Sequence, residues 1–253
     1  MRFLALHFQA PLASFGDVMV DNYGNTALFP ALSMVTGLLA NALGYDRTEK
    51  TRLDALQKSL LLGSFHWGPA PERLPDFQTL RLNEPGEHWL NQGWTSFGAP
   101  EGRDGEKKPA THIRYRHYLA DVDMNVLVAS QPTGHGAPTL GDFEQALLKP
   151  ARPLSLGRKP CLPSAPLLAV TPQNRYVEGT SMREALLTLA TRRARTMDPP
   201  PSTITLQRPA NESDEALRTK SITDERNWIG GFHGGERQVV VEANVQLPPL
   251  ESP

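Results

Sequence analysis

The heptapeptide RFLALHF, residues 2–8, decides the architecture of this chain. Successive side chains of a strand point to opposite faces, and here both faces carry apolar residues. A strand that is apolar on both faces lies inside a sheet rather than at its edge. We therefore expect an internal β-strand at the start of the chain, ended by Pro11.

Periodic patterns further along the chain predict the remaining elements. Apolar residues at helical spacing predict helices over 30–43, 51–61, 139–148 and 181–195. Alternating or short apolar runs predict strands over 60–67, 76–82, 112–118, 124–129, 167–170, 204–206 and 238–245. A strand, a helix and a strand followed by the same trio is the ferredoxin-like pattern, so we expect an α+β fold of that type.

A turn-rich insert, residues 83–111, separates the alternating strands at 76–82 and 112–118. It is polar and rich in glycine and proline, and it holds several aromatic and cationic side chains: Trp89, Trp94, Phe97, Arg103, Lys107 and Lys108. A structureless loop of this length is uncommon unless it is functional. We expect a long β-hairpin that projects from the body. Its aromatic rings either stack on bases or pack against a neighbouring protein, and for the tryptophans we favour packing on a partner or on the hairpin itself.

Composition places the chain among ordinary globular proteins. Its 253 residues are 39% hydrophobic and 21% charged, which suffices for a proper core without disulfides or metal. Cys161 is the only cysteine, which excludes an internal disulfide and favours a reducing cytoplasm. We expect no signal peptide and no membrane association, because no apolar run approaches the ~20 residues of a membrane span.

The formal net charge of −1 hides an uneven distribution. Residues 1–145 carry 12 basic and 16 acidic side chains, residues 146–195 carry 9 and 2, and residues 196–253 carry 5 and 9. A basic block between two acidic ones suggests a localised contact with a polyanion. The alternative is that these arginines form a solvated helix face.

The basic block begins with LSLGRKPCLPSAPL, residues 154–167. Its prolines and glycine rule out a helix, and Arg158 and Lys159 make it too basic for a core strand. Prolines lower the entropy lost when such a loop binds a ligand, and an arginine fork suits phosphate. The loop is either a rigid cationic contact for nucleic acid or a basic turn packed against the last strands.

Several segments, taken in order, resemble one known family. They are PLASFG at 11–16, FP at 29–30 with Ser33, GLL at 37–39, ALG at 42–44 with Arg47, DFQT at 76–79, YRHYLAD at 115–121, LKP at 148–150 and LGRKPCLPSAPL at 156–167. Each is weak alone, but the ordered set over residues 1–170 is specific. It resembles the CasD family (the Cas-five family) of type I-E CRISPR surveillance complexes, whereas residues 171–253 resemble that family only thinly.

The resemblance implies a fold and a function in antiviral defence. It implies a RAMP protein with a ferredoxin-like, RNA-recognition-type domain over 1–170, including a protruding hairpin, the thumb, at about 78–118. Residues 171–253 would form a helix and a small, mainly β region packed on that domain. The chain would be a non-catalytic subunit of Cascade that caps the 5′ handle of the crRNA and kinks the guide with its thumb.

The resemblance also implies partners and contact residues. The partners would be the crRNA handle, the backbone RAMP subunit, the large subunit and, indirectly, target DNA. No cofactor or metal is implied. The expected RNA contacts are Ser14, Ser33, Lys107, Lys108, Arg114, Arg116, Arg158, Lys159 and Ser164.

This chain departs from the family pattern at the predicted first helix. The family usually has Pro-Thr-Lys/Arg-Ser at its entry, where this chain has PALS at 30–33. A helix N-terminus attracts phosphate through free N–H groups, but here only Ser33 and the backbone remain to do so. The family's preceding arginine is also missing near Asn22, Tyr23 and Asn25, and the arginines at 192–195 have no counterpart.

Two alternative functions stay open. Relatives in type I-C systems cleave precursor crRNA without metal by means of Tyr, Lys and His, and this chain has candidates for such a set: Lys107, Lys108, His112, Tyr115 and His117. Histidine can exchange protons near neutral pH, but alternation puts the two histidines on opposite faces, and their spacing is poor for a metal. The other alternative is a scaffold whose basic patch meets only protein carboxylates.

Overall fold

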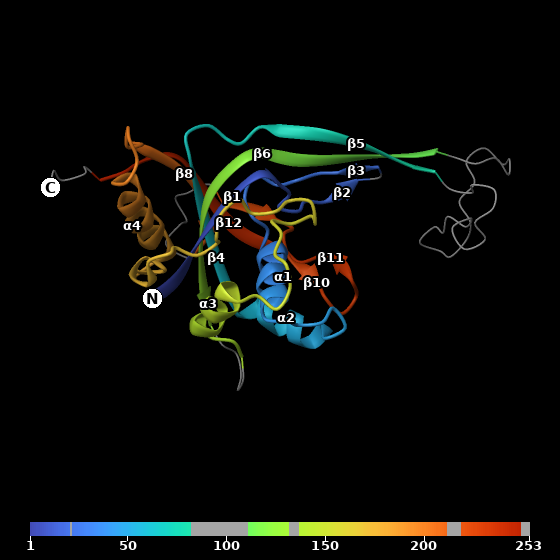
Figure 1. Cartoon of the computed structure of the whole chain (residues 1–253), viewed down its shortest axis with the longest axis horizontal. Coiled ribbons are helices and arrows are strands. Elements are labelled where there is room, and N and C mark those ends of the chain that lie inside the picture. Colours follow the sequence, from blue (N-terminus) through green and yellow to red (C-terminus); the bar gives the residue numbers. More distant parts are fainter. Residues whose placement is uncertain (21, 82–110, 132–136, 212–218, 249–253) are drawn as a thin grey trace.

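The computed structural model describes residues 1–20, 22–81, 111–131, 137–211 and 219–248. It has a mixed α/β architecture, with helices packed on one large, mostly antiparallel sheet (Figure 1). The helices are α1 (Leu32–Ala42), α2 (Lys50–Ser59), α3 (Leu140–Leu148) and α4 (Met182–Ala194), with a 3₁₀ turn at Pro172–Asn174. The strands are β1 (Arg2–Ala13), β2 (Met19–Val20), β3 (Tyr23–Gly24), β4 (Leu60–Trp67), β5 (Arg73–Arg81), β6 (Thr111–Ser130), β7 (Tyr176–Glu178), β8 (Thr203–Pro209), β9 (Thr219–Ile222), β10 (Arg226–Asn227), β11 (Phe232–His233) and β12 (Arg237–Gln246).

Strand β6 connects the two parts of the sheet, because it runs for 20 residues. Its second half pairs antiparallel with β1 and with β4. Its first half pairs antiparallel with β5 and parallel with β3, and this part of the ribbon extends away from the helices (Figure 1). On the other side, β8 pairs with β4, β12 with β8, and β9 with β12.

Two expectations about strands β1 and β6 are wrong. β1 does not end at Pro11, and the strands expected at 112–118 and 124–129 are one continuous strand. The ladder pairs Ala10 with Val122 and Leu12 with Ala120, so the proline lies between two paired positions. Proline cannot donate to the ladder. Asp121, next to those positions, has a φ of 48°, and both strands continue past this local irregularity.

The sheet separates two hydrophobic cores, and β1 contributes to both. Leu4, Leu6 and Phe8 enter the core that contains α1 and α3, whereas Phe3 and Ala5 enter the core that contains α4. All five are at most 7% exposed. Full burial of one large apolar side chain contributes about 1.5–3 kcal/mol, so this strand is a major source of stability. The prediction of an internal first strand is confirmed.

All four predicted helices are present, and the observed ends of each helix differ from the predicted ends by at most two residues. Thr139 precedes α3 in a capping box, accepting from the N–H of Asp142, whose carboxylate accepts from the N–H of Thr139. The strand expected at 167–170 is reduced to one bridge between Leu168 and Leu6. None of the described helices is long and apolar enough to cross a membrane.

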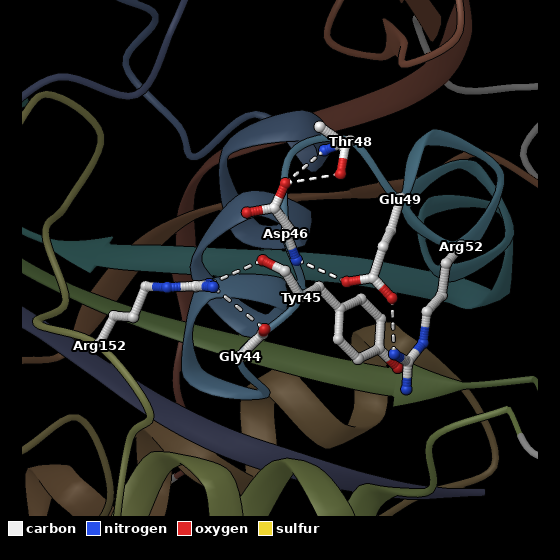
Figure 2. Close-up of polar contacts among 7 residues, drawn as sticks. All are labelled: Gly44, Tyr45, Asp46, Thr48, Glu49, Arg52 and Arg152. Atoms are coloured by element: carbon white, nitrogen blue, oxygen red, sulfur yellow. Dashed lines mark hydrogen bonds and ion pairs between the residues drawn. The ribbon is translucent and has the colours of Figure 1, made fainter.

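The segment after α3 is anchored to the C-terminal end of α1 (Figure 2). Arg152 donates to the carbonyl oxygens of Tyr45 at 2.7 Å and Gly44 at 3.2 Å, where cations are favoured by the helix dipole. The N–H of Ala151 also donates to the carbonyl of Ala42 at 2.9 Å. Figure 2 also shows the hydrogen bonds of the following turn, which involve Asp46, Thr48, Glu49 and Arg52. This anchor fixes the start of the loop at 154–167.

The N-terminal end of α1 is capped by a residue 192 positions away. The carboxylate of Asp224 accepts from the N–H of Leu32 at 3.0 Å, and its backbone carbonyl accepts from the N–H of Ser33 at 2.9 Å. Arg237 pairs with the same carboxylate at 2.6 Å, and both charged side chains are largely buried. The C-terminal part of the chain thus supplies the negative charge that a helix N-terminus favours.

The expected domain division at 170/171 stays a prediction. Strands from both sides of that position share the large sheet, because β7 pairs with β1 and β8 pairs with β4. In addition, the side chain of Gln57 in α2 accepts from the N–H of Arg226 at 3.1 Å and from the indole of Trp228 at 3.0 Å. The C-terminal part is therefore packed tightly on the first.

Substituting Asp224 by alanine tests the cap on α1. We expect Asp224→Ala to lower the free energy of unfolding by about 3–5 kcal/mol, because it leaves the buried Arg237 without its carboxylate. Chemical denaturation measures this loss. Glu236→Ala, which removes an exposed carboxylate from the same segment, is the control and should change stability by less than about 0.5 kcal/mol. Equal effects of the two substitutions would contradict the role of the cap.

Candidate nucleic-acid interface

A cavity of about 670 Å³ lies where β3 and β6 meet one side of α1, from Ser33 to Asn41, the loop at 155–158 and the β10–β11 ribbon. Four of the nine predicted contact residues line it: Ser14, Ser33, Arg116 and Arg158. Arg226 and His233 also line it, whereas Asp17 is the single carboxylate among the described residues of its lining. The cavity therefore carries an excess of positive charge.

Gly157 explains the tight course of the loop at 154–167. Its φ is 96°, and a Cβ at this position would lie 1.6 Å from the carbonyl oxygen of Ser14. Only glycine allows the two backbones to approach so closely. The N–H of Ser14 donates to Leu156 at 3.0 Å, and Leu156 donates to Cys161 at 2.7 Å. Cys161 is fully buried and burial raises its thiol pKa, which makes it a packing residue.

Arg158 is half-buried and is held in place by two backbone carbonyls. Its guanidinium donates to His117 at 2.9 Å and to Gly24 at 2.8 Å, and it lies 4.9 Å from the ring centre of Tyr118. These contacts join the loop to β3 and β6. The turn is therefore packed against the sheet, but on β3 and β6 rather than on the last strands. Arg158 also lines the cavity, and its contact with nucleic acid stays a prediction.

The guanidinium groups of Arg116 and Arg158 both pack on Gly24. A Cβ added to Gly24 would lie 2.6 Å from a terminal nitrogen of Arg116 and 2.9 Å from one of Arg158. Arg116 otherwise contacts the sulfur of Met19 at 3.7 Å. Two like charges held this close, without a carboxylate between them among the described residues, favour the approach of an anion.

An exposed row of aromatic rings lies on the other face of the same ribbon. In the ladder, Tyr115 pairs with Tyr23 on one side and with Phe77 on the other. The rings of Tyr23 and Tyr115 are stacked at 4.9 Å, and Phe77 lies 6.2 Å from Tyr115. Phe77 is 58% exposed and Tyr23 is 47% exposed. The sequence analysis missed this row, because only the pairing of β3 with β6 brings Tyr23 beside Tyr115.

Arg114 lies on the same face of β6 as Arg116, opposite Tyr115, because successive residues of a strand point to alternate faces. Its guanidinium donates to the side-chain oxygen of Asn22, which is one of the residues noted above in place of a family arginine. The predicted contacts Arg114 and Arg116 therefore share one face of β6.

The remaining predicted contacts lie elsewhere or outside the described residues. Lys159 and Ser164 are exposed but do not line the cavity, and the N–H of Ser164 donates to Gln9 at 2.7 Å. Lys107 and Lys108 lie outside the described residues, as do the tip of the expected hairpin and the side chain of His112. Of the nuclease candidates suggested by the sequence, Tyr115 and His117 lie within the described residues.

The backbone of the α1 N-terminus is not offered to a phosphate. Its first two N–H groups donate to Asp224, so the expectation that they attract an anion fails. The hydroxyl-bearing residue Ser33 still lines the cavity, although it is only 7% exposed. Within the described parts of the chain, no group of three or more His, Cys, Asp or Glu residues could hold a metal ion.

Known proteins of one family are similar to this chain. A family model described as CRISPR-associated protein (Cas_Cas5) matches residues 3–240. Among curated proteins, the CRISPR system Cascade subunit CasD of Escherichia coli (strain K12) is 29% identical over 171 residues, which cover 68% of this chain and 71% of that protein.

Two solved structures share the fold. A chain titled CRISPR RNA-guided surveillance complex has a TM-score of 0.62 at 20% identity, covering 97% of this chain and 91% of that one. A chain titled Crystal structure of Cas protein has a TM-score of 0.56 at 21% identity, covering 97% of each chain. The similarity extends over both parts of the large sheet.

Neighbouring cations of the loop at 154–167 should respond differently to substitution. We expect Arg158→Ala to lower the free energy of unfolding by about 2 kcal/mol, because two carbonyl oxygens lose a charged donor. Lys159→Ala is the matched control, and it should leave stability within about 0.5 kcal/mol because the side chain is exposed. Thermal and chemical denaturation measure both, and an equally harmless Arg158→Ala would show that its two hydrogen bonds are dispensable.

Proposed function

Because this chain belongs to the CRISPR-associated protein family (Cas_Cas5), we propose that it is a non-catalytic RNA-binding subunit of a type I-E surveillance complex, Cascade. In this proposal it caps the 5′ handle of the crRNA in antiviral defence. The hairpin at about 78–118 presses into the guide beside the handle and kinks it. The similarity to the Escherichia coli Cascade subunit CasD supports the choice of complex.

The strand order supports a ferredoxin-like unit as the body of the subunit. β4, β6, β1 and β7 lie side by side in that order, with antiparallel pairing throughout. Helices α1 and α3 connect these strands and cover one face. This is the neighbour order of a split βαβ fold. Three of these strands lie within the proposed unit of residues 1–170, whereas the fourth, β7, comes from residues 171–253, which also extend the sheet and cap α1.

The observation that carries the proposal is the pair of guanidinium groups over Gly24, in a cavity with three arginines and one exposed aspartate. A single-stranded RNA backbone supplies closely spaced phosphates, which match such a pair. The contact set we propose comprises Ser14, Ser33, Lys107, Lys108, Arg114, Arg116, Arg158, Lys159 and Ser164. Arg158 acts partly by holding the loop in place, whereas Arg116 presents its charge.

The aromatic row gives the bases a separate surface. Single-stranded nucleic acids bind by stacking bases on exposed rings while cations follow the backbone. Tyr23, Tyr115 and Phe77 lie on the face of the ribbon opposite Arg114 and Arg116. A bent RNA that crosses the ribbon edge can therefore place phosphates on one face and bases on the other.

The proposed partners follow from the same complex. They are the crRNA handle, the backbone RAMP subunit and the large subunit, with target DNA reached only indirectly. A scaffold that meets protein carboxylates alone would not need the stacked row of rings. For this reason we prefer RNA as the ligand of the cavity.

The two faces of the ribbon can be tested separately. Binding of an RNA that carries the repeat-derived handle is measured over a series of salt concentrations. Arg116→Gln should weaken binding and reduce the salt slope by about one, because one phosphate contact is lost. Phe77→Ala should weaken binding by about 1–3 kcal/mol with an unchanged salt slope, because stacking carries no charge.

Arg47→Gln is the control for this series, since it removes an exposed cation that does not line the cavity. It should leave both affinity and salt slope unchanged. A salt slope that falls as much with Arg47→Gln as with Arg116→Gln would show only a general charge effect. Unchanged RNA binding in Arg116→Gln and in Phe77→Ala would contradict the proposal.

A cleavage assay distinguishes the proposed function from the alternative, a metal-independent ribonuclease. If our proposal is correct, purified protein incubated with precursor crRNA in EDTA should leave the RNA intact, because we assign no catalytic residue. Gel electrophoresis detects cleavage. A product that appears with the unmodified chain and disappears in Tyr115→Phe or His117→Ala would replace our proposal by the nuclease function.

A further inference from the structure

A second cavity, of about 260 Å³, lies on the opposite face of the sheet, where the C-terminal end of α4 meets β1 and β6. Along most of this face the packing of α4 is apolar. At this end the lining becomes polar, with His7 from β1, Asn125 from β6, and Arg192 and Arg193 from α4. The two arginines belong to the basic cluster that the family resemblance leaves without a counterpart.

The polar groups of this cavity form one connected cluster. His7 and Asn125 are direct partners in the β1–β6 ladder. Arg193 donates to the side-chain oxygen of Asn125 at 2.6 Å, and its other terminal nitrogen lies 3.4 Å from Nε2 of His7. The same Nε2 donates to Asp123 at 2.8 Å. These contacts leave part of the guanidinium of Arg193 available at the cavity wall.

The cluster lacks one acceptor. Asn125 is fully buried, and the nitrogen of its amide has no hydrogen-bond partner among the described residues. A buried donor without an acceptor is unfavourable, and native proteins avoid it unless a ligand or water supplies the acceptor. A group with several acceptor atoms in the cavity would satisfy this amide and Arg193 together.

The cluster also has fewer carboxylates than guanidinium groups. Asp123 is the single carboxylate in contact with it among the described residues, and the hydrogen bond from His7 holds the pKa of Asp123 below its usual value. Burial lowers the pKa of both Arg192 and Arg193, and their mutual repulsion lowers that of Arg192 further. Arg192 donates to the backbone carbonyls of Asn174 and Tyr176. The site therefore favours an anion.

We propose that this cavity binds a phosphate group, held by Arg193, by the amide nitrogen of Asn125 and by the charge of Arg192. A phosphate has enough oxygens to accept from both side chains at once, and an arginine fork suits it. The volume is below the ~300–1,000 Å³ of cofactor pockets, so the occupant is one phosphate group rather than a whole cofactor. The group is either free phosphate or the terminal phosphate of an RNA, and both share this chemistry.

Isothermal titration calorimetry of the full chain with sodium phosphate, at constant ionic strength, tests the proposal. The unmodified chain should bind phosphate, and Arg193→Gln should raise the dissociation constant at least about tenfold. Arg195→Gln is the matched control, because it removes an exposed cation from the end of the same helix, outside this cavity. It should leave the dissociation constant within about twofold.

A second variant keeps the test decisive if Arg193→Gln does not fold. Asn125→Asp places a carboxylate beside Arg193, where it takes the position of the anion. It should abolish phosphate binding while the thermal midpoint stays equal or rises. The proposal is overturned if the unmodified chain does not bind phosphate or if Asn125→Asp leaves binding unchanged. It is also overturned if Arg195→Gln weakens phosphate binding as much as Arg193→Gln does, or if the chain prefers acetate to phosphate.

Further titrations distinguish the source of the phosphate. A trinucleotide RNA with a 5′-phosphate should bind more tightly than inorganic phosphate if RNA is the natural ligand, and equally if free phosphate is. In either case Asn125→Asp should abolish binding. Arg116→Gln, which tests the proposed RNA site on the other face, should leave these titrations unchanged, so the two proposals fail independently.

Discussion

Strand β6 runs without a break through both parts of the large sheet, and its pairing sets the positions of the strands beside it. The half of this strand that pairs with β1 and β4 is buried between two cores, and the other half carries Arg114, Tyr115 and Arg116 on the extended ribbon. Because both halves belong to one strand, the core fixes the position of the proposed RNA contacts. The loop at 154–167 is fixed in turn, since Arg158 binds backbone carbonyls of β3 and β6.

The parts of the fold that could be predicted from the sequence depend on local patterns. Apolar periodicity located the four helices and the internal first strand, because burial on one or both faces imposes a repeat. Contacts between distant segments left no such signal. The capping of α1 by Asp224, the contact of Gly157 with Ser14 and the stacking of Tyr23 on Tyr115 depend on pairings that no local pattern encodes. Four of the nine predicted contact residues line one cavity, and the others needed tertiary information.

Arginines that look alike in the sequence have different roles in the folded chain. Arg158 and Arg192 donate to backbone carbonyls and hold segments together. Arg237 is buried against a carboxylate, so its charge is neutralised. Arg116 and Arg193 instead present their guanidinium groups to cavities on opposite faces of the sheet. The local charge balance that suggested a polyanion contact therefore marks several different sites, and only burial and partners tell them apart.

In the function we propose, RNA lies across the ribbon, with its phosphates on the face that carries Arg114 and Arg116 and its bases on the face that carries the aromatic row. Photo-crosslinking of the purified complex, with 4-thiouridine placed at single positions of the handle and mapping by mass spectrometry, measures this directly. We expect neighbouring handle bases to crosslink to Tyr23, Phe77 or Tyr115, and we expect these crosslinks to disappear at high salt. Efficient crosslinks that map only to α4 or to the outer face of α2, with none on the ribbon, would contradict it.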